Sequence, residues 1–416
     1  MINVVTKREI DNNIDRLLGS YDKLEKILVI PPDFTRMHSE AGYITNYIYN
    51  KLSGSCVVDI LPALGTHDTM TKEECLEMFG DIPYDVFIPH NWREDVVKIG
   101  EVPSDFVSEI SNGLVTNSID VEVNKHIMDT SYDLVVSIGQ VVPHEVIGMA
   151  NYSKNVFVGC GGSNIINQSH MLGAVYGMEN VMGKDYSPVR KVFDYAEEKF
   201  LEEINLTYIL TVTTQNEGNT VVNGMFCGRE RKYFEEAVKL SQELNIEILD
   251  SPVEKVVVFL DEKEFKSTWL GNKAIYRTRM TIKDGGELII FAPGVRKFGE
   301  DKTNDELIRK YGYVGREKIL KLSKVCDDLK GNLSASAHLI HGSSDDRFDI
   351  TYVTKELNRE EVESVGFKYM SYEEGLKRYN ICEFKDGMNV LSNGEEILYI
   401  SNPALGLWTS KEKFYE

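Results

Sequence analysis

Short apolar runs alternate with helix-length amphipathic segments along the first half of the chain. The segment Ile44–Leu52 is typical of a helix, and a long, mainly helical stretch leads to the amphipathic segment Arg229–Leu244. Parallel strands that are buried on both faces appear as continuous apolar runs of this kind. The pattern therefore predicts a mainly parallel sheet with five strands, at Lys26–Ile30, Val57–Pro62, Asp85–Pro89, Asp133–Ile138 and Asn155–Val158.

A break at Leu249–Pro252 separates this pattern from a second alternation of strands and helices. A chain of 416 residues exceeds the roughly 250–300 residues at which single cores stop growing. We therefore expect two α/β domains, residues 1–250 and 251–416, with the last ~14 residues returning to the first domain and the active site in the cleft between them. The elements predicted in the second domain are strands at Lys255–Leu260, Glu287–Ala292, Phe348–Val353, near Gly366 and at Ile397–Ser401, and helices at Asn272–Lys283, Asn304–Tyr311, Glu317–Leu329 and Tyr372–Arg378.

Composition narrows the class of protein. Hydrophobic residues make up 42% and charged residues 27% of the chain, as in ordinary globular proteins, and the net charge of −20 argues against nucleic acid or an anionic membrane as partners. The sequence predicts no signal peptide and no transmembrane helix. The six cysteines are scattered without a C-x-x-C pair, which favours a reducing, cytoplasmic location.

Polar groups follow several of the predicted strands. Asp33 and Arg36 come after the first strand, His67 after the second and His144 after the fourth. Functional groups in parallel α/β sheets collect at the carboxyl ends of strands, so these residues are candidates for one site. The Asp33–Arg36 pair suits an arginine that a carboxylate aims at an anion, although a surface ion pair of little energetic value is the simpler interpretation.

The densest concentration of candidate chemistry lies between Val141 and His170. His144 is followed by Lys154, then by a glycine turn over 159–163, and then by His170. Backbone N–H groups in such a turn can converge on an anion such as a phosphate. The same residues are also compatible with a tight structural turn and with hydrogen-bonded core histidines, and neither a dinucleotide fingerprint nor a Walker A pattern is present.

Taken together, these motifs resemble the lactate racemase family. Its pattern is D-x-x-R after the first strand, G-x-H after the second, and P-H-x(9)-K-x(15)-H, which this chain matches at Asp33 and Arg36, at Gly65 to His67, and at Pro143-His144, Lys154 and His170. In the second half, Lys273 stands twelve residues before Gly285-Gly286, at the spacing of the family's substrate lysine. The resemblance covers nearly the whole chain.

The resemblance implies a nickel-pincer nucleotide (pyridinium-3,5-bisthiocarboxylic acid mononucleotide with nickel) attached covalently to Lys154. His170 would be the protein ligand to nickel, and His67 and His144 the two acid–base residues on opposite faces of the substrate. A histidine suits this role because it can accept and donate a proton near neutral pH. Arg36 and Lys273 would hold the substrate carboxylate, and Asp33, with Gly159, Gly161, Gly162 and Ser163 of the turn, would complete the cofactor site.

The chain departs from the family pattern where the substrate is expected. Leu270 replaces the usual glutamine, Trp269 and Asn272 flank it, and Asp284 replaces the proline of the P-G-G turn. We therefore expect a racemase or epimerase that inverts C2 of a larger 2-hydroxy acid, such as an aldonate, with Trp269 among its substrate-binding residues. A racemase of lactate or another short 2-hydroxy acid is the alternative.

Two other classes of protein remain open from the residues alone. A zinc metallohydrolase would use His67, His144 and His170, although no H-x-H or H-E-x-x-H pair is present. A sugar- or nucleotide-binding protein without catalysis is the other. The expected partner is a small anionic 2-hydroxy acid, and a second copy of the chain in a homodimer is also considered.

Overall fold

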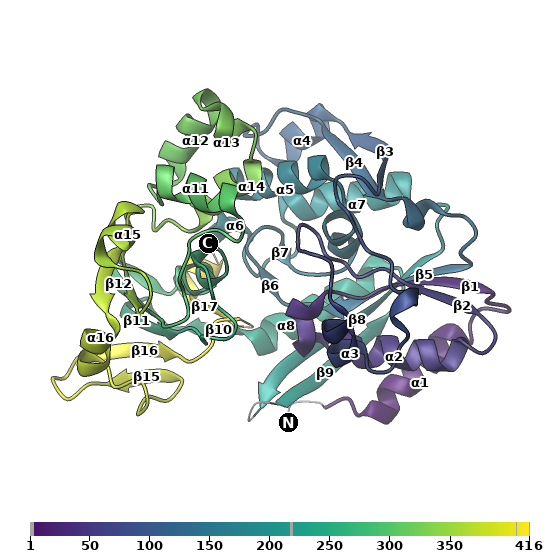
Figure 1. Ribbon diagram of the computed structural model, residues 1–416, viewed down its shortest axis with the longest axis horizontal. Helices are drawn as coiled ribbons and strands as arrows, with labels where there is room; N and C mark the ends of the chain where they lie inside the picture. The colour runs from purple at the N-terminus through teal and green to yellow at the C-terminus, as the bar shows by residue number, and fades with distance from the viewer. Residues whose placement is uncertain (1–3, 217–218, 405, 416) are drawn as a thin grey trace. The chain divides into compact units, whose positions relative to one another are not determined.

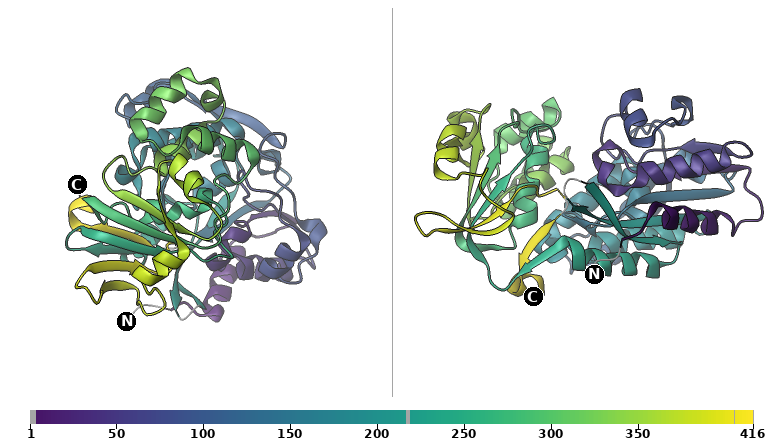
Figure 2. Two further views of the ribbon diagram at one scale, coloured as in Figure 1. Left: turned by 60° about the vertical axis from the view of Figure 1, so that its left-hand side comes forward. Right: turned by 90° about the horizontal axis from the view of Figure 1, so that it is seen from below.

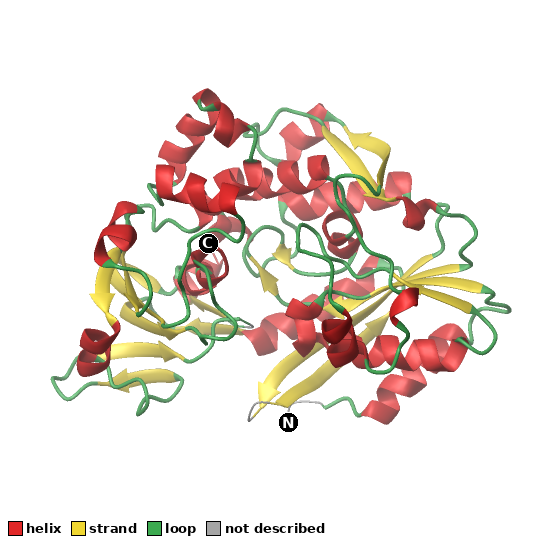
Figure 3. Cartoon of the chain, viewed as in Figure 1, coloured by secondary structure: helices red, strands yellow, loops and turns green. Residues whose placement is uncertain are grey.

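The computed structural model describes residues 4–216, 219–404 and 406–415, and the chain divides into two units. Unit 1 comprises Met1–Leu172 and Gly183–Asn245, and unit 2 comprises Gly173–Met182 and Ile246–Glu416. The predicted α/β class is confirmed, because each unit is built on a mainly parallel sheet with helices packed against it (Figures 1 and 3).

The sheet of unit 1 has the strand order β2-β1-β5-β8-β9, in which β9 alone is antiparallel. One apolar layer packs α1, α2 and α3 against the sheet, and a second packs α5, α7 and α8 against its other face. The strands of the unit are β1 (Lys26–Ile30), β2 (Val57–Ile60), β3 (Val96–Val102), β4 (Ile119–Asn124), β5 (Leu134–Gln140), β6 (Pro143–His144), β7 (Gly148–Met149), β8 (Leu206–Asn216) and β9 (Asn219–Cys227). Its helices are α1 (Lys7–Leu18), η1 (Phe34–Ser39), α2 (Ala41–Leu52), α3 (Lys72–Phe79), η2 (Tyr84–Val86), α4 (Ser104–Ile110), η3 (Lys125–Met128), η4 (Asn155–Gly159), α5 (Ser163–Tyr176), α7 (Pro188–Phe200) and α8 (Arg231–Asn245).

The sheet of unit 2 has the order β14-β13-β12-β11-β16-β15, again with one antiparallel edge strand, β15 (Figure 2). Its strands are β10 (Ile246–Leu249), β11 (Val253–Phe259), β12 (Ile282–Ala292), β13 (Asp349–Thr354), β14 (Lys368–Ser371), β15 (Gly387–Val390), β16 (Glu396–Ile400) and β17 (Leu407–Ser410). Its helices are α6 (Met178–Val181), α9 (Thr268–Gly271), α10 (Lys273–Thr278), α11 (Lys302–Tyr311), α12 (Arg316–Val325), α13 (Asp327–Lys330), α14 (Leu333–His341), α15 (Arg359–Ser364), α16 (Tyr372–Arg378) and α17 (Lys411–Tyr415).

Two predicted strands of unit 1 are wrong. The segment Asp85–Pro89 forms the turn η2 and a single bridge from Phe87 to β2, because the prolines at its two ends cannot donate ladder hydrogen bonds. The segment Asn155–Val158 is a buried π-helix, η4, rather than a strand. A short, fully buried apolar run does not distinguish a strand from a helix.

Other boundaries also differ from the predictions. The stretch predicted as mainly helical before Arg229 contains β8 and β9, which complete the five-stranded sheet. The helix predicted over Asn272–Lys283 ends at Thr278. Near the end of the chain, β17 pairs in parallel with β10 (Ile246–Leu249), which lies just before the predicted boundary at residue 250, and both strands belong to unit 2.

Candidate cofactor and substrate site

The carboxyl ends of β1 and β2 bring Asp33 and His67 together. The two strands are parallel neighbours, and a bridge from Pro32 to Ala63 extends their pairing into the following loops. Asp33 caps η1, where its Oδ1 accepts from the Thr35 backbone N–H at 3.2 Å and from the Thr35 hydroxyl at 2.6 Å. Its other oxygen is hydrogen bonded to His67 Nδ1.

The Asp33–His67 pair fixes the orientation of a histidine that reaches solvent. Burial alone would raise the pKa of the Asp33 carboxyl, but the hydrogen bond and charge of His67, the Thr35 hydroxyl and the charge of Arg36 hold it below its usual value. The His67 side chain is 53% exposed, whereas Asp33 is buried. With Asp33 accepting a hydrogen bond from His67 Nδ1, Nε2 is the ring nitrogen left to exchange a proton with a ligand.

Arg36 lies on η1, one turn after Asp33, and is half-buried. Within residues 4–216, 219–404 and 406–415, its guanidinium makes no hydrogen bond or salt bridge, although its charge acts on both Asp33 and Lys154. A guanidinium that is partly desolvated and without a carboxylate partner is suited to hold an anionic ligand.

His144 lies on a small hairpin that follows β5. Strands β6 and β7 pair through Pro143 with Met149 and His144 with Gly148, which buries the His144 ring. The Val146 backbone N–H donates to His144 Nδ1 at 3.2 Å, so the neutral ring carries its proton on Nε2. The carboxylate of Glu145, which the sequence did not point to, lies 3.9 Å from the same Nδ1.

Lys154 stands at the start of η4 and is only partly accessible. Burial, reinforced by the charges of Arg36 and Arg190, lowers the pKa of its amine to about 8, against the opposing charges of Glu145 and Asp33. No carboxylate of the described chain lies within salt-bridge distance of Nζ. A lysine with a lowered pKa carries a substantial neutral fraction near physiological pH, which makes it a nucleophile.

His170 lies within α5 rather than in the glycine turn. Its Nδ1 donates to the Ile166 carbonyl one helical turn earlier, at 2.6 Å, and burial together with the charge of Lys154 keeps the pKa of the ring low. The Nε2 lone pair of this neutral ring is therefore available to a metal. Histidine ligands commonly donate their other ring N–H to a carbonyl in this way. The charges of Arg36, Asp33 and Glu145 act on Lys154, and those of Lys154 and Glu145 act on His170, so these side chains lie within electrostatic range of one another.

The glycine turn differs from the open anion-binding loop that we predicted. The N–H of Gly162 donates to the Glu122 carbonyl at 3.1 Å, and the N–H of Asn164 donates to the Glu122 carboxylate at 3.0 Å. A Cβ on Gly161 would lie 1.9 Å from the Phe157 carbonyl oxygen, and a Cβ on Gly162 would lie 2.3 Å from Glu122 Oε2. The glycines at 161 and 162 are therefore required for close packing, and Glu122 accepts hydrogen bonds from the N–H groups of Gly162 and Asn164.

His90 packs against the glycine turn and does not belong to the candidate site. It is buried and bridges the Gly161 carbonyl, at 3.2 Å, and the Asn124 amide, at 3.0 Å. Cys160, inside the turn, is also buried, and burial raises the pKa of its thiol. Both residues are part of the packing that holds the start of α5.

Trp269 and Lys273 belong to unit 2, so their roles towards the unit 1 residues stay predictions. Trp269 stacks on the His338 ring with centroids 4.2 Å apart, and Lys273 Nζ lies 5.6 Å above the Phe265 ring. His338 is in turn hydrogen bonded to the hydroxyls of Tyr276 and Tyr313, each at 2.9 Å. Sequence reasoning missed His338 because no element was predicted for residues 333–341, where α14 lies.

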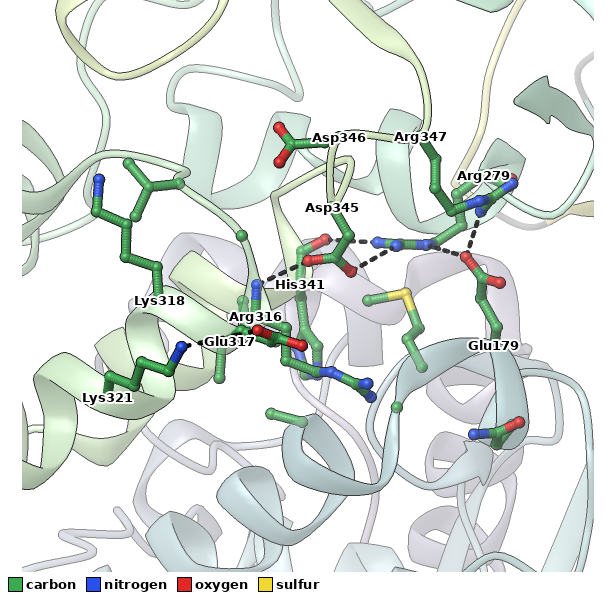
Figure 4. Close-up of a pocket in the computed structure, with 17 residues that line it drawn as sticks. Glu179, Arg279, Arg316, Glu317, Lys318, Lys321, His341, Asp345, Asp346 and Arg347 are labelled. Atoms are coloured by element: carbon green, nitrogen blue, oxygen red, sulfur yellow. Dashed lines mark hydrogen bonds and ion pairs between the residues drawn. The ribbon is translucent and has the colours of Figure 1, made fainter. Parts of the chain in front are cut away.

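A cavity of about 730 Å³ lies within unit 2 and is rich in charged side chains (Figure 4). Glu179 joins two arginines there: it accepts from Arg279 Nε at 2.9 Å and from Arg347 Nη1 at 2.5 Å. Arg279 also donates to Asp345 at 3.1 Å. Burial would raise the pKa of Glu179, but the two arginines hold it below its usual value. These charges are satisfied by one another.

The grouping of possible metal ligands among the described residues bears on the zinc alternative. In that part of the chain, no group of three or more His, Cys, Asp or Glu side chains is arranged to hold a metal ion, which does not favour the zinc metallohydrolase. None of the helices described is long and apolar enough to cross a membrane.

Comparison with known proteins gives a consistent result. Residues 6–183 match the model of the lactate racemase N-terminal domain. A crystal structure of a Thermotoga maritima structural-genomics protein is similar with a TM-score of 0.82 and 24% identity, over 98% of each chain. The lactate racemase apoprotein from Thermoanaerobacterium thermosaccharolyticum is similar with a TM-score of 0.73 and 18% identity, over 98% of this chain and 93% of that one. No curated protein matches the sequence.

Proposed function

We propose that this chain, whose residues 6–183 match the lactate racemase N-terminal domain, is a member of that family and inverts C2 of a 2-hydroxy acid with a nickel-pincer nucleotide attached to Lys154. The observation that carries this proposal is the environment of the Lys154 amine. Its amine is partly buried, lies near the charges of Arg36 and Arg190, and has a pKa lowered to about 8. An amine of this kind suits covalent attachment of an acyl-type group.

His170 fits the role of nickel ligand. Its Nδ1–H is held by the Ile166 carbonyl, which fixes the tautomer and leaves Nε2 for a metal. Nickel accepts imidazole nitrogen together with soft sulfur ligands. When bound, the nucleotide would supply the hydride acceptor and donor for C2. The remaining chemistry is the transfer of the hydroxyl proton, which falls to the protein.

The two proposed acid–base histidines are held in opposite tautomers. Asp33 accepts from His67 Nδ1, so its Nε2 can take the hydroxyl proton of one stereoisomer. The Val146 N–H donates to His144 Nδ1, so the neutral ring carries its proton on Nε2. To return a proton to the oxygen of the other stereoisomer, His144 would act as the imidazolium, whose charge the Glu145 carboxylate, 3.9 Å from Nδ1, would stabilise. Inversion needs one base and one acid in each direction, and this pair supplies both.

Substrate selection is proposed to rest on two cations and on the aromatic group of unit 2. Arg36 and Lys273 would hold the carboxylate. Trp269 stacked on His338, with Leu270 and Asn272 beside it in sequence, favours a larger hydroxylated acid such as an aldonate over lactate. Aromatic faces bind the apolar faces of such molecules.

The attachment is tested by producing the protein in a host that makes the nucleotide and measuring its intact mass and nickel content. We expect one adduct per chain in the wild-type protein and none in Lys154→Ala. Full adduct mass in Lys154→Ala would refute the attachment site.

The substrate is identified by a separate experiment. The loaded protein is assayed with a panel of 2-hydroxy acids, and inversion at C2 without exchange of solvent protons marks the substrate.

A further inference from the structure

The loop that delivers Lys154 has an unusual backbone. Asn151 and Tyr152, directly before Ser153 and Lys154, both adopt left-handed conformations, with φ of 67° and 58°. Asparagine tolerates this region, but it is costly for a residue as large as tyrosine. Something outside the loop must therefore hold this conformation, because the sequence from Met149 to Ser153 contains no glycine.

Three groups between Gly183 and the first turn of α7 donate hydrogen bonds to this loop and to the residues just before it. The Gly183 N–H donates to the Gly148 carbonyl at 3.0 Å, and the Ser187 hydroxyl donates to the Ile147 carbonyl at 2.7 Å. Arg190, on the first turn of α7, makes the largest number of these bonds. Its Nη1 donates to Ser153 Oγ at 2.8 Å, and its Nη2 donates to the carbonyls of Met149, at 2.8 Å, and Asn151, at 3.1 Å.

The burial of Arg190 makes these bonds unusual. The residue is fully buried, its guanidinium lies 4.4 Å from the Phe234 ring centroid, and no carboxylate forms a salt bridge with it in the described part of the chain. A buried arginine is normally matched by an acid, because desolvating its charge is expensive. Asp194 and Asp185 act on Arg190 only through their charges, without touching it. Its hydrogen bonds go instead to loop carbonyls and one loop hydroxyl, so the buried guanidinium stabilises the shape of the loop.

We propose that Arg190 is the positioning residue for Lys154: its guanidinium clamps residues 149–153 in the left-handed turn that presents the lysine to the site. The ring of Tyr152 completes the clamp by packing against Tyr208 and Phe234, with centroids 4.3 and 5.0 Å away, while its hydroxyl donates to the Arg229 carbonyl. Only the role of Lys154 as the attachment point rests on the proposed function. The clamp itself exists without the nucleotide.

The test uses the full chain without nucleotide and two readouts. The first is amide hydrogen exchange of the peptide covering residues 149–154. The second is the pH profile of Lys154 acylation by a small activated ester, mapped by peptide mass spectrometry. Arg190→Met should speed exchange in this peptide about tenfold or more, because three hydrogen bonds to the loop are lost. The acylation profile should also move to higher pH, because water reaches the amine and because the charge of Arg190, which lowers the pKa of Lys154, is lost. Arg190→Lys keeps that charge and so isolates the effect of the hydrogen bonds, and each unit of movement lowers the neutral fraction at pH ~7.5 about eightfold.

Arg231→Met is the matched control. Arg231 lies near the same Phe234 ring and pairs with Asp185 and Asp194, but it has no bond to residues 149–153. We expect it to leave both readouts at wild-type values even where it lowers stability. Arg190→Lys, which keeps the charge but can satisfy fewer acceptors, should fall between wild type and Arg190→Met.

If Arg190→Met does not fold, Ser153→Ala replaces it, since this change removes one of the three bonds and should shift both readouts in the same direction by less. The proposal is overturned if a folded Arg190→Met, or Ser153→Ala in its place, keeps wild-type exchange and acylation. It is also overturned if Arg231→Met shifts both readouts equally. Neither result depends on the nucleotide, so failure of the clamp is distinct from failure to find an adduct on wild-type protein.

Discussion

Two arginines of the unit 2 cavity have carboxylate partners, whereas the cations of the unit 1 site have none in the part of the chain that the structure describes. In unit 2, Arg279 is nearly fully buried and is matched by Glu179 and Asp345, and Arg347 shares Glu179. In unit 1, Lys154 and Arg36 have no carboxylate partner among the described residues, and they lie close enough for the charge of Arg36 to lower the pKa of Lys154.

The difference separates structural from functional charge. A matched cation costs little and holds elements together, whereas an unmatched, desolvated cation destabilises the fold unless a ligand completes it. The cavity of unit 2 is therefore a structural cluster, although its arginines are more numerous. The unit 1 residues, whose cations lack such matching, are where we propose that an anionic ligand binds.

The largest effect that this comparison predicts concerns the two histidines of unit 1. If His67 serves one stereoisomer and His144 the other, each alanine variant should lose net inversion but still take hydride from one isomer. General acid–base catalysis is typically worth roughly 10²–10⁴-fold, so the asymmetry should be large. A single-turnover assay with C2-deuterated substrate should show deuteride leaving one isomer only, with the preferred isomer exchanged between the variants. Equal slowing of both isomers in both variants would mean that the two-base mechanism is wrong.

The next effect tests the structural role of the unit 2 cluster. Glu179→Ala leaves Arg279 and Arg347 without their shared acid, and we expect a loss of about 2–3 kcal/mol in the free energy of unfolding, below the roughly 3–5 kcal/mol of a fully buried pair. Denaturant unfolding measures this loss. Acylation of Lys154 should be unchanged, and Glu254→Ala, which removes an exposed salt bridge of the same unit, is the control.

The smallest predicted effect is an increase in stability, whereas most substitutions lower the free energy of unfolding. The pKa of Lys154 falls from 10.5 to about 8 on folding, so the unfolded chain binds the proton more tightly, and wild-type stability rises with pH across that window. Lys154→Met removes this penalty, and we expect it to stabilise the nucleotide-free protein by about 1–2 kcal/mol at pH ~7, after allowing for partial solvation of the amine. Thermal unfolding should show the gain shrinking towards pH ~10. A destabilised variant at pH ~7 would contradict the unmatched-charge account.

The candidate site shows which features local sequence can predict. The positions of Asp33 and His67 follow from where β1 and β2 end, and the structure joins the two side chains by a hydrogen bond. The strands themselves were predictable where an apolar run was bounded by turn residues, as at Lys26–Ile30. These are properties of the chain within a few residues.

The features that were missed depend on distant parts of the chain. The packing of the glycine turn was not predictable because it depends on Glu122, from β4, whose carbonyl accepts from the Gly162 N–H and whose carboxylate accepts from the Asn164 N–H. Asn155–Val158 is as apolar as a buried strand, and only its surroundings make it a π-helix. Arg190 contacts a loop about forty residues earlier, and nothing in its own neighbourhood indicates that contact.

The most direct test of the account is the mass of the peptide that contains Lys154, measured in protein from a host that makes the nucleotide. The account predicts that this peptide carries the nucleotide, that nickel is present at about one per chain, and that His170→Ala keeps the adduct while losing the nickel. A Lys154 peptide of unmodified mass in protein that nevertheless inverts a 2-hydroxy acid would contradict the central claim, and so would an adduct on a different lysine.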